Sequence, residues 1–240
     1  MKQFKFFSAA GLIMLMLFSC NSNSDQNTTA ATSKDSSAPT PTQPAAPAKP
    51  AITMLIKHKV ANFDKWFPAY EGHDSVRQSY GLHNFVVGRG IKDSNMVLVA
   101  LHVDDTAKAV EFSKMPALKA SMEKAGVVGA PTITYMVNQW RDSTTDASIT
   151  RVIINQKVKD WDTWKKAFDD HKPARVAAGL TDRSVSQALG DPHSVSVVLV
   201  VNDMKKAEDF MHSKDLKDKM MEAGVEGAPD IFFYRVIKQY

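Results

Sequence analysis

Cysteine is almost absent from this sequence, since Cys20 is the only one among 240 residues. A chain with a single thiol forms no internal disulfide, so a hydrophobic core must hold its folded part together. Long apolar runs are missing as well. The stretch from Phe6 to Phe18 is shorter than the ~20 residues that a helix needs to span a bilayer.

The common motifs of metal and phosphate sites are also missing. The sequence contains no H-x-x-x-H, no H-E-x-x-H and no pair of cysteines, so we expect no metal site. It contains no P-loop, no G-x-S-x-G and no G-x-G-x-x-G. Gly88-Arg89-Gly90 has two glycines, but no helix is expected after it, and we interpret it as a turn at the end of a strand.

Charge of one sign is not in large excess. The chain carries 30 basic and 26 acidic residues, and the loss of Lys2 and Lys5 with a cleaved leader would bring it closer to neutrality. No basic stripe with interleaved aromatic residues is present, so we expect no nucleic acid partner.

The first residues are typical of an export signal. Lys2 and Lys5 precede the apolar run, and we assign residues 1–19 to a signal peptide. The run ends in Leu17-Phe18-Ser19-Cys20, which resembles the lipobox of bacterial lipoproteins. That resemblance implies cleavage before Cys20 and lipid on its sulfur, and several acyl chains give stable membrane anchoring. An ordinary signal peptide or an uncleaved anchor are the alternatives.

Localisation follows from this assignment. We expect an exported protein that is lipid-anchored to the cell envelope, with the membrane as a partner through the lipid on Cys20. Asn21 and Ser22 follow the cysteine in place of an aspartate, which favours the outer membrane if the cell is Gram-negative. Residues 20–50 are rich in Ser, Thr, Asn, Ala and Pro. Such a segment buries too little apolar surface to offset the entropy of ordering, so we expect a disordered linker.

The remainder of the chain is an internal duplication. FDKWFPAYEGHDSVRQSYGL (63–82) aligns with WDTWKKAFDDHKPARVAAGL (161–180) without a gap, and the same shift places AGVVGAPTI on AGVEGAPDI. Roughly a third of the paired residues are identical. The sequence therefore predicts two domains of one kind, over residues 51–140 and 149–240.

Each repeat predicts the order β-α-β-β-α-β, a ferredoxin-like unit. A strand over 52–60 comes first in the first copy, and a helix that Asn62 caps and Gly81 ends follows it. The later predictions for this copy are strands over 82–91 and from Met96, a short helix capped by Asp105, a helical piece from Pro116 to Gly126, and a last strand over 133–137. The second copy repeats these signals with Asp160, Gly179, Asp203, Gly224 and a last strand over 231–237.

Strand composition indicates how the copies meet. Right-handed crossovers place both helices of a repeat on one face of its sheet, so the other face should be polar if it met water. MVLVALHV (96–103) and IFFY (231–234) are instead apolar on both faces, which indicates burial on both sides. We therefore predict an α+β fold in which two sheets pack together as a single-chain pseudo-dimer, a closed or nearly closed barrel with four helices outside. No further oligomer is required.

The sequence resembles one superfamily. The order of elements, the F/W-x-x-W…H-x-x-x-R…GL helix and the AGV-x-GAP turn are similar to the dimeric α+β barrel proteins, which include the antibiotic-biosynthesis-type monooxygenases. The resemblance covers both copies. It implies a ligand site between the helices and the outer sheet face of each half. It implies no single activity, because members include cofactor-free oxygenases, haem-degrading and haem-binding enzymes, lactone isomerases and domains of unknown role.

The candidate ligand-lining residues form a helical stripe in each copy. An imidazole and a guanidinium beside aromatic rings can orient an anionic or aromatic ligand, or exchange protons with it. The structural alternative is that the histidine binds a loop carbonyl, the arginine pairs with a nearby carboxylate, and both close the apolar face. The stripe consists of Trp66, Tyr70, His73 and Arg77 in the first copy and of Trp164, Phe168, His171 and Arg175 in the second.

Two strand histidines occur in the first copy only. His58 aligns with Gln156, and His102 aligns with Val200. One functional half and one degenerate half would fit this difference, and an exposed strand histidine is the alternative. No cofactor is predicted, although haem with an axial His73 or His171 is compatible with the resemblance.

Two functions remain open. The favoured one is a lipid-anchored envelope module that binds a small molecule or serves as a scaffold. The alternative is a cofactor-independent, monooxygenase-like enzyme that acts on a small aromatic or anionic substrate. The enzyme hypothesis requires the ring of His73 or His171 to face a cavity of ligand size. The sequence assigns no catalytic residue.

Overall fold

The computed structural model describes residues 50–144 and 148–240. The expected signal peptide, the lipid site at Cys20 and all but the last residue of the expected linker lie outside these ranges. Within them, the helices are all too short or too polar to cross a membrane.

The first repeat follows the predicted order of elements. Its strands are β1 (Ile52–Val60), β2 (Leu82–Gly90), β3 (Met96–Val103) and β4 (Val127–Arg141), and its helices are α1 (Phe63–Gly72), α2 (Asp74–Ser79), α3 (Thr106–Lys114) and α4 (Pro116–Lys124). The predicted caps are present. The side chain of Asn62 accepts a hydrogen bond from the N–H of Lys65 at 3.0 Å, and Asp105 accepts one from the N–H of Ala107 at 2.8 Å.

The second repeat has the same elements in the same order. Its strands are β5 (Thr150–Val158), β6 (Leu180–Ala188), β7 (Asp191–Val201) and β8 (Val225–Gln239), and its helices are α5 (Trp161–Asp170), α6 (Lys172–Ala177), α7 (Met204–Met211) and α8 (Lys214–Glu222). Asp160 caps α5 by accepting from the N–H of Thr163 at 2.8 Å.

The first helix of each repeat is broken, and the prediction of a continuous helix was wrong. His73 has φ −96° and ψ 12°, and its N–H donates to the carbonyl of Tyr70, three residues back, at 3.2 Å. His171, with φ −85° and ψ 6°, interrupts the helix of the second repeat at the matching position, but its N–H donates to the carbonyl of Ala167, four residues back, at 3.1 Å. One tightened turn leaves the apolar spacing almost unchanged, so the sequence pattern does not reveal it. The division between α3 and α4, by contrast, agrees with the short helix capped by Asp105 and the separate helical piece expected from Pro116.

The last strand of each repeat is longer than predicted. β4 and β8 span 15 residues each, and the AGV-x-GAP segment belongs to the strand from its valine onwards, with only the Ala-Gly pair before it. Gly129, with φ +74°, lies in a bulge where the register of β1 jumps from Lys57↔Thr132 to Lys59↔Val128. The C-terminal parts of both strands extend further because they pair with the other repeat.

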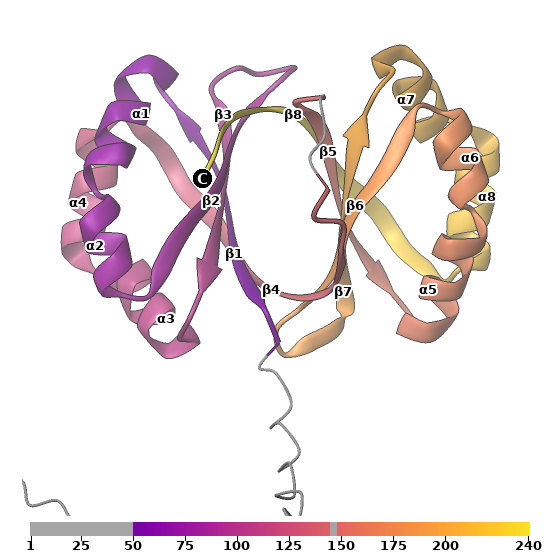
Figure 1. Cartoon of the computed structure of the whole chain (residues 1–240), viewed down its shortest axis with the longest axis horizontal. Helices are drawn as coiled ribbons and strands as arrows, with labels where there is room; N and C mark the ends of the chain where they lie inside the picture. The colour runs from indigo at the N-terminus through magenta and orange to yellow at the C-terminus, as the bar shows by residue number, and fades with distance from the viewer. Residues whose placement is uncertain (1–49, 145–147) are drawn as a thin grey trace, which may run out of the picture. The chain divides into compact units, whose positions relative to one another are not determined.

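The eight strands close into one barrel in the order β1-β3-β2-β8-β5-β7-β6-β4. The repeats join where β2 pairs with β8 and where β4 pairs with β6, both antiparallel. The helices of each repeat cover the outer face of its own half (Figure 1). These findings confirm the predicted α+β fold, a single-chain pseudo-dimer with a closed barrel.

Strand β3 shows why its sequence does not alternate. Val97, Val99 and Leu101 belong to the core that packs against the helices, whereas Leu98 belongs to a second core with Ile153 and Tyr234. Both faces of the strand are therefore buried, one under the helices and one inside the barrel. The apolar run follows from this two-sided burial.

A methyl group at Gly88 should disrupt the seam between β2 and β8. The Cβ of an alanine there would overlap Cδ2 of Tyr234 and lie 2.9 Å from Cε2, and this buried ring has little room to move. We expect Gly88→Ala to lower the free energy of unfolding by about 1–3 kcal/mol in urea titrations, the usual cost of overpacking.

Gly72→Ala is the matched control, because no atom beyond its chain neighbours and the backbone of its own helix lies within 4 Å of its Cβ position. Alanine also has the higher helix propensity, so this variant should be as stable as the wild type or slightly more stable. Equal losses from the two substitutions would show that the seam is not tightly packed.

Candidate functional site

Each repeat has a cavity between its helices and the outer face of its sheet. The cavity of the first repeat has a volume of about 100 Å³ and that of the second about 90 Å³. Pockets for drug-sized ligands begin at ~300 Å³. In this conformation each cavity therefore accommodates only a small molecule, well below drug size.

The structure places all eight residues of the predicted stripe in the walls of these cavities. Trp66, Tyr70, His73 and Arg77 line the cavity of the first repeat, and Trp164, Phe168, His171 and Arg175 line that of the second. The opposite walls are formed by apolar strand residues, such as Val99 in the first repeat and Val197 in the second.

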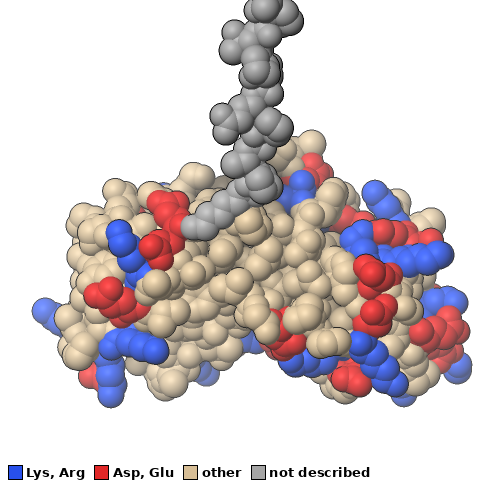
Figure 2. Space-filling view, turned by 90° about the horizontal axis from the view of Figure 1, so that it is seen from below, with Lys and Arg blue, Asp and Glu red and all other residues tan. Residues whose placement is uncertain are grey.

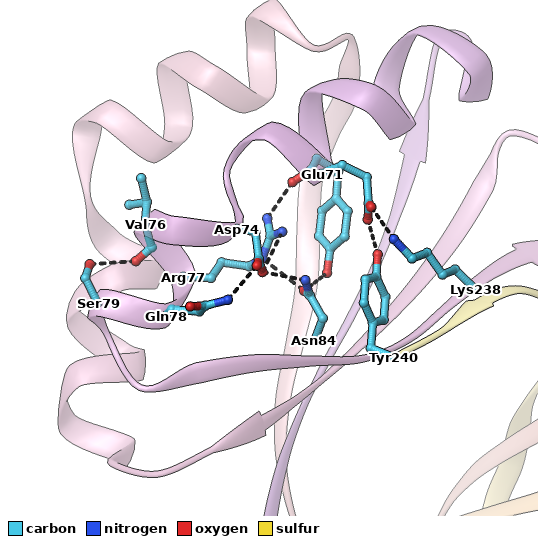
Figure 3. A network of polar contacts seen from close by, with 10 residues as sticks. Glu71, Asp74, Val76, Arg77, Gln78, Ser79, Asn84, Lys238 and Tyr240 are labelled. Atoms are coloured by element: carbon cyan, nitrogen blue, oxygen red, sulfur yellow. Dashed lines mark hydrogen bonds and ion pairs between the residues drawn. The ribbon is translucent and has the colours of Figure 1, made fainter.

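Each stripe arginine connects the helix break of its repeat to the sheet, and Figure 3 shows the contacts of Arg77. Arg77 stacks on the ring of Tyr70, with its Cζ 3.9 Å from the ring centroid, and its Nη1 donates to the Tyr70 carbonyl at 2.7 Å. Its Nε donates to Asn84 Oδ1 on β2 at 3.1 Å. Arg175 makes the corresponding contacts, but its strand partner is a carboxylate, Asp182, to which Nε and Nη2 donate at 2.7 and 2.8 Å.

The same network reaches the end of the second repeat (Figure 3). Lys238 pairs with the carboxylate of Glu71 on α1, and the hydroxyl of Tyr240 donates to it. Burial acts to raise the pKa of Glu71, but these two bonds lower it below its usual value. The end of β8 is thereby tied to a helix of the other repeat.

The two stripe histidines have different surroundings. The Nε2 of His171 lies 3.0 Å from a carboxylate oxygen of Asp215 on α8, and its ring centroid is 5.7 Å from that of Phe210. Ala117 occupies the position of Asp215 in the first repeat. Within the described residues, no hydrogen bond ties the ring of His73 to a neighbour, although this ring lines the cavity.

His58 is the polar group that points most clearly to a ligand. It lines the cavity of the first repeat, its side chain is buried, and neither ring nitrogen has a hydrogen-bond partner among the described residues. Its ring meets Trp66 edge-on, with centroids 5.3 Å apart. Burial lowers its pKa to about 4, so the imidazole is neutral at pH 7. A buried polar group without a partner costs about 1–3 kcal/mol, which a ligand atom in the cavity can recover.

Tyr135 on β4, a half-buried residue with a buried hydroxyl, was missed by the sequence analysis. Its hydroxyl has no partner among the described residues, and it packs against the same core as Trp66. The second repeat has Gln156 and Phe233 at the positions of His58 and Tyr135. The difference between the two copies singled out His58 in the sequence, and the same signal could have found Tyr135. His102 lies elsewhere, against the ring of Phe85 at 4.5 Å between centroids.

The described residues contain no group of three or more His, Cys, Asp or Glu side chains that could hold a metal ion. The haem hypothesis meets two obstacles. His171 is already bound to Asp215, and both cavities are smaller than pockets for drug-sized ligands. A haem would fit only after the helices had moved outward.

The burial of His58 predicts a pH dependence of stability. Because its pKa is about 4 when folded and 6.5 ordinarily, the unfolded chain takes up the proton first as the pH falls. Wild-type stability should therefore fall, relative to His58→Gln, by up to about 3 kcal/mol between pH 6.5 and 4, with no difference arising above this window. Urea titrations of both proteins across this range measure the effect, and parallel curves would refute the buried, neutral imidazole.

The arginine of the second repeat should matter for stability. Arg175→Met leaves the carboxylate of Asp182, which is only 10% exposed, without its partner. We expect a loss of about 3 kcal/mol in the free energy of unfolding, as when one member of a buried ion pair is removed. Adding Asp182→Asn should restore part of it, and a loss below about 0.5 kcal/mol would show that the pair does not hold the helix.

No family model matches the sequence, and no curated protein matches it. Solved structures match the fold. An anthrone oxidase-like protein matches with a TM-score of 0.57 at 12% identity, covering 80% of this chain and 94% of its own. A proposed chlorite dismutase matches with a TM-score of 0.53 at 13% identity, covering 79% and 96%.

A proposed monooxygenase from Lactobacillus acidophilus matches with a TM-score of 0.51 at 12% identity, covering 78% of this chain and 94% of its own. At such low identity these similarities concern the fold alone. The chain has the fold of the dimeric α+β barrel proteins.

Proposed function

We propose that this protein is a lipid-anchored envelope module that binds a small, mainly apolar molecule in the cavity of its first repeat. The observation that carries the proposal is His58, a buried imidazole that lines this cavity with both nitrogens unpartnered among the described residues. The second repeat completes the barrel, and Gln156 replaces the histidine there.

The proposed anchor rests on the sequence. The apolar run before Cys20 and the lipobox-like residues 17–20 support lipidation of the only thiol in the chain. The Pro-rich segment that follows would hold the barrel away from the membrane. On the face shown in Figure 2, acidic and basic side chains are interspersed towards both ends, with no continuous patch of one sign. Lipid, not surface charge, is thus the proposed membrane contact.

The chemistry of the cavity defines the class of ligand. A neutral imidazole donates through one nitrogen and accepts through the other, so a hydroxyl group is a suitable partner. The remaining wall is largely apolar and aromatic, with Trp66, Leu101 and Met122 among its residues. With a volume of about 100 Å³, the site fits a molecule of the size of a small phenol.

Phenol is a direct probe of this site. We expect phenol to raise the Tm of the wild-type protein in a concentration-dependent way, because it binds only the folded state. His58→Leu should weaken binding about tenfold, which corresponds to the loss of roughly 1.4 kcal/mol. Gln156→Leu is the matched control in the other repeat and should leave phenol binding unchanged. Equal binding by His58→Leu and the wild type would refute the proposed site.

A monooxygenase-like enzyme is the second candidate function. It is supported by the neutral His58, which can accept a proton from a bound aromatic molecule, and it agrees loosely with the fold that the chain shares with a proposed monooxygenase. This alternative requires oxygen consumption that depends on the aromatic substrate and disappears in His58→Gln. Phenol binding without oxygen uptake would contradict the enzyme function and leave binding as the only supported function.

A further inference from the structure

The barrel interior contains a third cavity, which is separate from both outer ones. Its volume is about 70 Å³, and strands of both repeats line it. Part of its wall is apolar, with Leu55 and Val198 among its residues. The other part is unusually polar for the inside of a small barrel, since it includes Arg141, Arg151, Arg183, Ser184, Ser186 and Ser196.

The strand register brings these side chains together. Arg141 at the end of β4 pairs with Ser184 on β6. Ser186, two residues further along the same face of β6, pairs with Ser196 on β7. A row of hydroxyl groups thus runs along β6 and β7, with a guanidinium at one end.

The charge in this cavity has one sign. No Asp or Glu is among its lining residues in the part of the chain that the structure describes. Asp142, which follows Arg141, binds Thr144 through both carboxylate oxygens. Burial lowers the pKa of Arg141, and the positive charge of Arg183 lowers it further, so the two guanidinium groups lie close enough to repel each other.

The arginines keep donors available for a ligand. Arg141 lies over the ring of Phe85 at 4.4 Å, donates from Nη2 to Thr53 at 3.4 Å, and donates from Nε to the side-chain oxygen of Asn138 at 3.2 Å. Arg183 donates from Nη1 to the carbonyl of Thr144. Each guanidinium has five N–H donors, so these bonds occupy only part of their capacity.

Ser196 provides an independent sign of a missing partner. Its side chain lines the cavity and is 3% exposed, and its hydroxyl has no hydrogen-bond partner among the described residues. A buried hydroxyl in this condition costs free energy, which an acceptor inside the barrel would recover.

The polar wall is not needed to build the barrel. The duplication places Gln239 at the position of Arg141, Phe85 at that of Arg183 and Leu98 at that of Ser196. The barrel therefore also closes with neutral and apolar side chains at the equivalent positions. The charged set is an addition that the fold itself does not require.

We propose that the interior of the barrel binds a small oxyanion, a phosphate or a carboxylate, between Arg141, Arg183 and Ser196. Planar guanidinium groups bind such anions through paired hydrogen bonds, and a hydroxyl adds a further donor. Arg141 and Arg183 are partly exposed, so the anion can enter from their end of the barrel. The site shares no residue with the cavity of His58 and is independent of the proposed function.

Binding can be measured on the full-length protein at pH 7. Inorganic phosphate and acetate are the two probes, each compared with sodium chloride at equal ionic strength. We expect one or both to raise the Tm above its value in chloride, with calorimetry giving the dissociation constant. Binding of phosphate alone would identify a phosphate site, and binding of acetate alone a carboxylate site.

Four variants test the assignment. Arg141→Gln should weaken binding of the effective anion at least tenfold, and Ser196→Ala should weaken it several-fold. Lys108→Gln, which removes an exposed positive charge from α3, is the control for net charge and should leave it unchanged. In chloride, Arg183→Gln should keep or raise the Tm, because it removes a repelling charge.

Several results would overturn the proposal. One is a Tm that neither phosphate nor acetate raises above its value in chloride. Another is unchanged binding in Arg141→Gln. A large fall of the Tm of Arg183→Gln in chloride would also overturn it, because the guanidinium group would then be needed to stabilise the folded protein.

Discussion

The pairing of β2 with β8 and of β4 with β6 is the constraint on which the rest of the structure depends. Each repeat alone would be a four-stranded sheet with helices on one face only, and its other apolar face would be wet. The two seams turn these faces inward and close the barrel. The hydrophobic effect thereby holds the two repeats together without a disulfide. The helices lie outside the barrel, and the cavities lie between them and the outer faces of the sheet.

The fusion of two copies lets each half carry different groups on one framework. The first repeat has His58 and Tyr135 facing its helices, where the second has Gln156 and Phe233. The second repeat contributes Arg183 and Ser196 to the barrel interior, where the first has apolar side chains. An assembly of two identical chains would repeat each group twice. A single chain can confine each set of polar groups to one place, and the proposed outer site and the proposed interior site both rest on this asymmetry.

Much of the fold could be predicted from the sequence, because burial on both faces leaves a direct signal in the run of residues 96–103. The helix caps at Asn62 and Asp160 were also predictable, because each bonds to a backbone N–H only three residues further along the chain. The helix break at His73 was not predictable, since one tightened turn hardly alters the apolar spacing. The stripe from Trp66 to Arg77 was found, but the strand partners of the arginines depend on tertiary contacts. Arg141 and Ser196 lie far apart in sequence, and only the strand register brings them into one cavity.

Native-state hydrogen exchange of the backbone amides tests the closure of the barrel most directly. If the seams close the barrel, the amides that bond between β2 and β8 and between β4 and β6 exchange only through global unfolding, as slowly as those between β1 and β3. Exchange at both seams that is orders of magnitude faster than within the sheets would show two loosely associated halves, and it would contradict the shared barrel from which the account begins.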